Sequence, residues 1–157
     1  MNTDKVENNA MRKKMRNEYE EVRLRAQKLH EEGKKLIMVD IDGTICDHKA
    51  DPKDSTIASQ NSFAIAEPFK ERINFINQLY DEGHWIMYWT ARGCYNGKDY
   101  YKETEKQLRD WGCRFSELNV YKPAYDLWID DKGVGVNRYQ EDFLRFQNDV
   151  LEGLEKC

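Results

Sequence analysis

Six polar side chains stand where apolar runs of the chain end, and their types are those that carry out chemistry together. Two aspartates lie two positions apart in the segment Asp40-Ile41-Asp42-Gly43-Thr44, directly after an apolar run. Thr90 follows the run Trp85-Ile86-Met87-Tyr88-Trp89, and Lys122 follows a shorter run. Asp130-Asp131 follows the run Leu127-Trp128-Ile129. Ligands bind beyond the carboxyl ends of strands in open α/β sheets, so these side chains are candidates for one shared site.

The charges of these residues indicate which ligands such a site would take. Carboxylates from Asp40, Asp42 and Asp130-Asp131 repel one another unless a cation lies among them, and hard oxygen ligands suit Mg²⁺. A lysine and a threonine beside them, Lys122 and Thr90, favour an anion held against that metal. Phosphate is the natural candidate.

The same residues suggest how a phosphate ester would react. The sequence places no serine, cysteine or histidine as a nucleophile, so a carboxylate must attack phosphorus or activate water. Asp40 could attack in line and form an aspartyl phosphate. Asp42 could protonate the leaving oxygen and later take a proton from water, while Mg²⁺ offsets charge repulsion.

The elements that must position these residues alternate along the chain. The patterns predict strands near 35–39, 85–89, 118–121 and 127–129, and helices over 68–83, 100–111 and 139–155. This alternation favours an α/β fold with a parallel sheet and right-handed crossovers. The run at 35–39 is typical of a fully buried strand.

Residues 1–33 are predicted to form a helical extension ahead of a domain at 34–157. The stretch from Met11 to Glu32 is rich in helix-forming residues, and Gly33 suits a helix C-cap. A narrow apolar stripe runs along it, made of Met15, Tyr19, Val22, Ala26 and Leu29. Packing on the protein's own core is favoured, and a homodimer through this helix is the alternative.

Composition and net charge limit the classes of binding partner that we expect. The chain has 157 residues, of which 39% are hydrophobic and 34% charged, and its net charge of −4 gives no reason to expect nucleic acid or an anionic membrane. Four scattered cysteines favour free thiols in a reducing compartment. No apolar run approaches the length of a membrane span or a signal peptide, so we expect a cytoplasmic protein acting on a small molecule.

The ordered motifs resemble those of the haloacid dehalogenase (HAD) superfamily of phosphohydrolases. The resemblance rests on Asp40-Ile41-Asp42-Gly43-Thr44, Thr90-Ala91-Arg92, Lys122 and Asp130-Asp131. It implies a Rossmann-like three-layer sandwich with strand order 5-4-1-2-3 and a Mg²⁺-dependent phosphatase. Asp40 would be nucleophile and metal ligand.

By the same resemblance, Asp42 would be general acid and base, and its backbone carbonyl would also reach the metal. Thr90 and Lys122 would grip the phosphoryl group. Asp130 or Asp131 would complete the metal shell, with Asp130 favoured as the direct ligand.

Spacing indicates a small member of that superfamily with no large cap domain. Asp42 and Thr90 lie 48 residues apart, which leaves room for a flap and one helix. Substrate selection would then fall to the flap at 46–66, which contains His48, to Ala91 and Arg92 beside Thr90, or to a second subunit. A structural salt bridge is the alternative role for Arg92. Small relatives with this style of second motif act in capsule or surface-polysaccharide biosynthesis, which points to a sugar, polyol or amino-alcohol phosphate.

Other functions fit some of these residues. Taken singly, Asp40 and Asp42 could cap a turn and Thr90 could cap a helix. A signalling receiver domain would need a different motif order, and an EF-hand would need other residues where Thr44 and Ile45 stand. The remaining alternatives are a phosphotransferase or mutase on the same scaffold and a non-catalytic binding module.

Overall fold

The computed structural model of the protein describes residues 3–47, 63–125, 127–136 and 142–156. The chain divides into two units, Met1–Leu36 and Ile37–Cys157, each described here by itself. Most of the predicted flap, including His48, lies outside the described residues.

The first unit is a single long helix, α1 (Thr3–Glu31), which begins eight residues before the predicted start. It ends as the sequence predicts: Gly33 adopts φ +69°, and the Lys34 amide donates to the Leu29 carbonyl at 2.7 Å. Tyr19 of the predicted apolar stripe is exposed. The homodimer stays a prediction. In the part of the chain that the structure describes, no helix combines the length and apolar character needed to cross a membrane.

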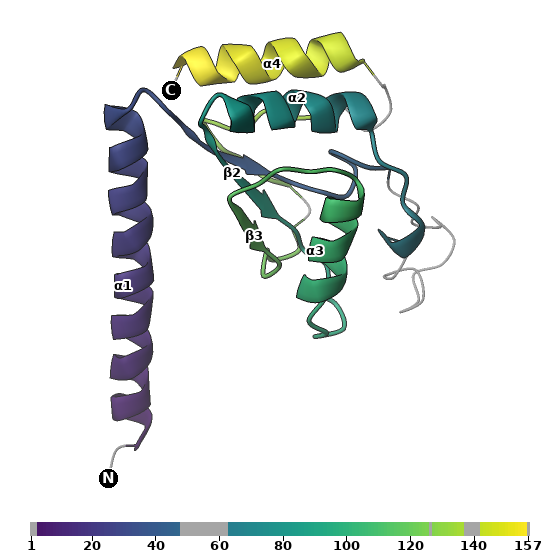
Figure 1. The fold of residues 1–157 in the computed structure, drawn as a ribbon. Helices are drawn as coiled ribbons and strands as arrows, with labels where there is room; N and C mark the ends of the chain where they lie inside the picture. Colours follow the sequence, from purple (N-terminus) through teal and green to yellow (C-terminus); the bar gives the residue numbers. More distant parts are fainter. Residues whose placement is uncertain (1–2, 48–62, 126, 137–141, 157) are drawn as a thin grey trace. The chain divides into compact units, whose positions relative to one another are not determined.

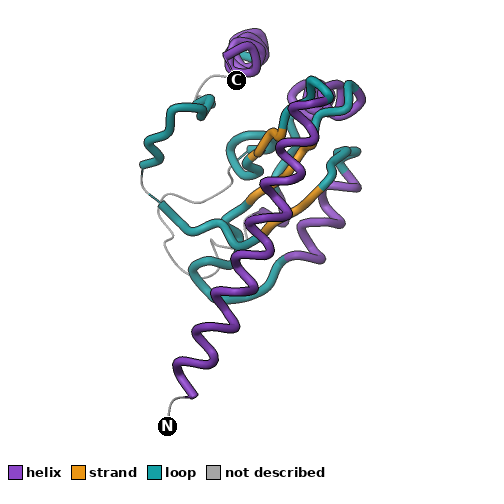
Figure 2. Tube along the Cα trace, turned by 90° about the vertical axis from the view of Figure 1, so that its left-hand side faces the viewer, coloured by secondary structure: helices purple, strands orange, loops and turns teal. Residues whose placement is uncertain are grey.

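Three strands form a parallel sheet in the order β1-β2-β3, which Figure 2 shows side by side. They are β1 (Leu36–Val39), β2 (Trp85–Trp89) and β3 (Glu117–Asn119). Tyr88 of β2 lies opposite Leu118 of β3. The α/β class and the parallel sheet are therefore as predicted.

Burial along the strands shows which parts of the sheet are covered. Ile86, Met87 and Tyr88 are consecutive and all buried, so both faces of β2 are covered, because successive side chains point to opposite faces. β1 is different: Val39 is buried but Met38 is 51% exposed. The prediction of a fully buried first strand is wrong, since β1 forms an edge of the described sheet and one of its faces stays open.

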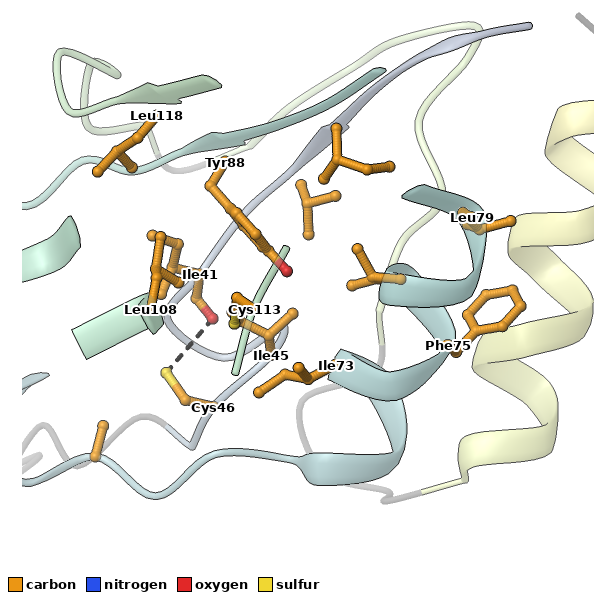
Figure 3. Close-up of a cluster of buried hydrophobic side chains, with 14 of the residues drawn as sticks. Ile41, Ile45, Cys46, Ile73, Phe75, Leu79, Tyr88, Leu108, Cys113 and Leu118 are labelled. Carbon is orange, nitrogen blue, oxygen red and sulfur yellow. Dashed lines mark hydrogen bonds between the residues drawn. The ribbon is translucent and has the colours of Figure 1, made fainter. Parts of the chain in front are cut away.

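Three helices accompany the strands: α2 (Lys70–Asp81), α3 (Tyr101–Asp110) and α4 (Phe143–Lys156) (Figure 1). The predicted apolar face of α2 is buried through Ile73, Ile76 and Leu79. Phe75 of α2 meets the rings of Phe143 and Phe146 of α4 edge-on, at centroid distances of 6.4 and 6.0 Å. Figure 3 shows Tyr88 pointing from β2 toward the side chains of α2 in this core.

The predicted strand at 127–129 is wrong. These residues have no strand structure, and Leu127 and Ile129 are 76% and 90% exposed. Trp128 packs its ring edge-on against Trp89 and donates from Nε1 to the Asp130 carboxylate at 2.9 Å. Aromatic packing against Trp89 therefore positions this segment, and backbone hydrogen bonds of a strand do not.

The turn after β2 contains two glycines with positive φ that differ in the space around them. Gly93 adopts φ +87°, and a Cβ built on it would lie 2.0 Å from the Lys98 carbonyl oxygen. Gly97 adopts φ +69° with nothing within 4 Å of such a Cβ. We expect Gly93→Ala to destabilise the protein by roughly 3 kcal/mol or more, because a backbone atom must move. The matched Gly97→Ala should cost only about 1–2 kcal/mol of left-handed strain. Denaturant unfolding measures both, and equal losses would contradict this geometry.

Candidate active site

The turn after β1 fixes Asp40 and Asp42 on one side of the chain. Ile41 between them is fully buried, as is Ile45, and the Ile45 amide donates to the Ile41 carbonyl at 3.0 Å. Because side chains alternate along extended backbone, burial of Ile41 directs both aspartates away from the core. Gly43 adopts φ +83°, which allows the chain to turn at once.

Three further contacts hold this turn, two within it and one to α2. The Gly43 amide donates to the Cys46 carbonyl at 2.9 Å, and the Cys46 thiol lies within 3.5 Å of the Ile41 carbonyl (Figure 3). Arg72 of α2 donates to the Thr44 carbonyl at 2.8 Å. The backbone that carries the two aspartates is therefore tied to α2 and to itself.

Thr90 and Lys122 are brought together by the pairing of β2 with β3. The Thr90 amide donates to the Asn119 carbonyl at 3.0 Å, and the Lys122 amide donates to the Thr90 carbonyl at 3.2 Å. Both side chains are buried. Backbone hydrogen bonds beyond the ends of two parallel strands thus place them as neighbours, as the sequence predicts.

Lys122 forms an ion pair with Asp40. Its Nζ lies 2.9 Å from Asp40 Oδ1, and the Thr44 hydroxyl donates to Asp40 Oδ2 at 3.3 Å. The ammonium also lies 5.1 Å from the centroid of the Tyr125 ring. The two charged residues are 82 positions apart, so the fold creates this pair.

Arg92 grips Asp42 with two hydrogen bonds. Its Nε donates to Asp42 Oδ2 at 2.9 Å, and its Nη2 donates to Oδ1 at 2.8 Å. The Thr90 hydroxyl reaches Oδ2 at 3.4 Å, and the Cys46 thiol reaches Oδ1 at 3.7 Å. A carboxylate offers about four acceptor positions. Each oxygen of Asp42 therefore has two donors near it.

Helix α3 and the segment before α2 hold Arg92 in turn. Its Nη1 donates to Thr104 Oγ1 at 3.3 Å and to Gln107 Oε1 at 2.8 Å. The Phe63 ring lies under the guanidinium at 4.3 Å, and Gln107 donates to the Phe63 carbonyl at 2.8 Å. Sequence reasoning missed these three residues. Two polar residues spaced by three on one helix face were the available signal.

Exposure is graded across the cluster. The side chains of Arg92 and Lys122 are only 3% and 9% exposed, whereas those of Asp42 and Asp40 are 23% and 34% exposed. The two cations therefore lie beneath the two carboxylates, and the carboxylates face solvent. The four charges sum to zero, so the cluster is neutral as it stands.

Five of the predicted site residues thus converge: Asp40, Asp42, Thr90, Arg92 and Lys122. His48 lies outside the described residues, and within them the remaining predicted residues form no hydrogen bond or ion pair with the four charged groups. Asp130 and Asp131 are exposed, and hydrogen bonds from the Lys132 amide and then the Trp128 side chain lower the pKa of Asp130. Ala91 is half-buried, and its carbonyl accepts from the Cys94 amide at 3.0 Å.

The described residues fit a metal in part. Asp40 is an oxygen ligand open to solvent, which suits Mg²⁺. Both oxygens of Asp42 already accept from Arg92. In the described part of the chain, no three acidic, histidine or cysteine side chains gather around one point. The full predicted ligand set is therefore not assembled in this structure.

A surface depression of about 380 Å³ lies elsewhere in the second unit. It is lined by the segment 131–135 and by residues of α4, among them Asp149 and Lys156. Asp131 is the only predicted site residue among its lining residues. The converging cluster is thus separate from this depression.

Comparison with known proteins adds evidence on the fold. No protein-family model matches the chain, and no curated protein matches it significantly. Among solved structures, the chain is similar to the crystal structure of an MCSG target from Vibrio cholerae, with a TM-score of 0.54 and 21% identity. The alignment covers 78% of this chain and 98% of that one. At this identity the similarity bears on the fold alone.

The described cysteines differ in burial, and this predicts different reactivity of their thiols. Burial, followed by the charge of Asp42, raises the pKa of Cys46, and burial raises that of Cys113 to about 11. Cys94 is exposed. Since the thiolate is the reactive form, we expect a thiol reagent at pH 8 to modify Cys94 quickly in the native protein. Cys46 and Cys113 should react only as fast as the protein unfolds. Mass spectrometry of the labelled peptides measures this, with Cys94→Ser as control; rapid native labelling of Cys46 would contradict its burial.

Proposed function

We propose that the protein is a Mg²⁺-dependent phosphomonoesterase that acts on a small phosphorylated metabolite through an aspartyl-phosphate intermediate. One observation carries the proposal: the ends of three parallel strands bring Asp40, Asp42, Thr90 and Lys122 into one hydrogen-bonded cluster. Residues 48 and 82 positions apart meet there. Turn-capping roles for each residue alone give no reason for this convergence.

In this proposal Asp40 attacks the phosphorus. Its carboxylate is the most exposed of the four charged groups of the cluster, and Lys122 neutralises it from below. A phosphate dianion approaching a bare carboxylate would be repelled, so the ammonium lowers the barrier to contact. Lys122 then stays beside the phosphoryl oxygens as negative charge develops on them.

Asp42 in its protonated form would give its proton to the leaving oxygen. It would later take a proton from the water that attacks the aspartyl phosphate, which releases phosphate and restores both carboxyl groups. The Thr90 hydroxyl donates to Asp42 in the described structure, and the Thr90 carbonyl accepts a hydrogen bond from the Lys122 amide. A hydroxyl in that position can turn from the carboxylate to a phosphoryl oxygen. Thr90 and Lys122 would thus hold the group that Asp40 attacks.

Mg²⁺ would be held by Asp40, by the backbone carbonyl of Asp42, and by Asp130 or Asp131. When bound, it would supply positive charge that offsets the phosphate dianion. The outward-facing carboxylates favour approach of a cation from solvent. The charges of the metal and of a phosphate dianion would cancel each other.

Completion of that ligand set requires the segment 127–131 to approach the exposed edge of β1. The HAD-like strand order and the three-layer sandwich belong to this proposal, since both need a further strand beside β1. The half-exposed Met38 and the exposed Leu127 and Ile129 are apolar surfaces that such an approach would cover.

The substrate class we propose is a sugar, polyol or amino-alcohol phosphate, as in capsule precursor synthesis. A phosphotransferase or mutase on the same scaffold is the alternative enzyme. Hydrolysis is favoured because the carboxylates face solvent, whereas a mutase must keep water from its intermediate. A non-catalytic binding module would not need both Asp40 and Lys122.

The central test is removal of the nucleophile. We expect Asp40→Asn to abolish Mg²⁺-dependent hydrolysis of an aryl phosphate while the protein stays folded, because the amide cannot attack phosphorus. Asp81→Asn is the matched control, since Asp81 is an exposed aspartate that pairs with Arg114 at 2.8 Å. It should keep full activity. Full activity of Asp40→Asn, or of the wild type in excess chelator, would refute this function.

A second test concerns the metal ligand from the 127–131 segment. We expect Asp130→Asn to raise the Mg²⁺ concentration for half-maximal activity by roughly tenfold or more, because a charged ligand is lost. Asp131→Asn should change it less. Metal titrations of the two variants separate them. Unchanged metal dependence in both would remove this segment from the metal site.

A further inference from the structure

We propose that Arg92 is a positioning residue that fixes the carboxylate of Asp42, and that α3 fixes Arg92 in turn. The inference rests on the proposed function in giving Asp42 a part in proton transfer. It chooses between the two roles that the sequence leaves open for Arg92, substrate contact and a structural salt bridge. The geometry of the guanidinium carries it.

The donors of Arg92 are almost all used within the protein. A guanidinium has five N–H groups. Four hydrogen bonds lead from it to side chains: two to Asp42, one to Thr104 and one to Gln107. One N–H group remains, and the side chain is only 3% exposed. A substrate phosphate would therefore have to displace Asp42 in order to gain a bidentate contact.

The grip sets the orientation of Asp42 as well as its charge. Two parallel hydrogen bonds of 2.8 and 2.9 Å hold both carboxylate oxygens in the plane of the guanidinium. A carboxylate that transfers protons must be aimed at the leaving oxygen, because small misplacement is costly. A lysine in place of Arg92 keeps the charge but cannot form the planar fork.

Helix α3 makes this arrangement rigid. Thr104 is fully buried, and Gln107 is tied both to Arg92 and to the Phe63 carbonyl. The Phe63 ring covers one face of the guanidinium. Arg92 is therefore clamped on three sides before any ligand arrives, which is how a positioning residue is supported.

The first experiment is steady-state kinetics of Arg92→Lys. We expect kcat to fall roughly 10²-fold, because Asp42 loses its alignment, while KM changes little. Gln107→Leu, which leaves Arg92 in place, should lower kcat by about tenfold with KM unchanged. A rise in KM with kcat preserved would show that Arg92 binds substrate, and would overturn the inference.

The second experiment tests whether Arg92 acts through Asp42. In an Asp42→Asn background, Arg92→Lys should cause no further loss of kcat, since the aligned carboxylate is already gone. If the fold-losses of kcat in the two single variants multiply in the double variant, the two residues act independently and the inference is overturned. Arg114→Lys is the matched control: Arg114 also pairs with an aspartate at 2.8 Å, but on the surface, and it should keep wild-type kcat.

A third measurement does not need activity and so separates this inference from the proposed function. Urea unfolding of wild type, Asp42→Asn, Arg92→Lys and the double variant gives a cycle of midpoints. If Arg92 holds Asp42, the double variant should unfold at the same urea concentration as the less stable of the two single variants. Additive shifts would overturn the inference. A wild type without phosphatase activity would refute the proposed function, and the urea cycle would still decide the role of Arg92.

Discussion

The structure of the second unit depends on one electrostatic constraint: two carboxylates that lie two residues apart must each have a cation of their own. Asp40 and Asp42 leave β1 on the same side of the chain because Ile41 is buried between them. Their mutual repulsion is offset by Lys122 for the first and by Arg92 for the second. The side chains of Lys122 and Arg92 are nearly buried, so each cation also needs its carboxylate partner.

That constraint explains why the polar ends of β2 and β3 are built as they are. The β2–β3 hydrogen bonding continues beyond the strands, from the Thr90 amide to Asn119 and from the Lys122 amide to Thr90. These backbone hydrogen bonds position Lys122 to form its ion pair with Asp40. Arg92, two residues after Thr90, reaches Asp42 from the same strand end and is braced by α3. The sheet and one helix thus carry the counter-charges, while the turn after β1 carries the carboxylates.

Sequence patterns predict some of this arrangement and not the rest, for physical reasons. The ends of parallel strands meet at one edge, so the convergence of Asp40, Thr90 and Lys122 follows from the apolar runs alone. The partner of Arg92 does not follow, because the reach and plane of a guanidinium depend on packing by Phe63 and Gln107. The run 127–129 misleads because a short apolar run with an aromatic residue suits a strand or ring packing equally. Here Trp128 lies against Trp89. The exposure of Met38 depends on which elements pack over β1, and one strand's own pattern cannot reveal this.

The two cations also differ in what they can still do, and this difference separates their roles. The Lys122 ammonium carries three N–H groups, of which Asp40 accepts one in the described structure, so it can bridge a nucleophile and an incoming anion. Arg92 has already committed four of its five to protein acceptors. A lysine that is nearly buried with donors to spare, beside an arginine with four of its five donors in use, fits the proposal that one cation meets the ligand and the other maintains the site. The fold alone, which the chain shares with the Vibrio cholerae structure, supplies no such distinction, because function resides in the site.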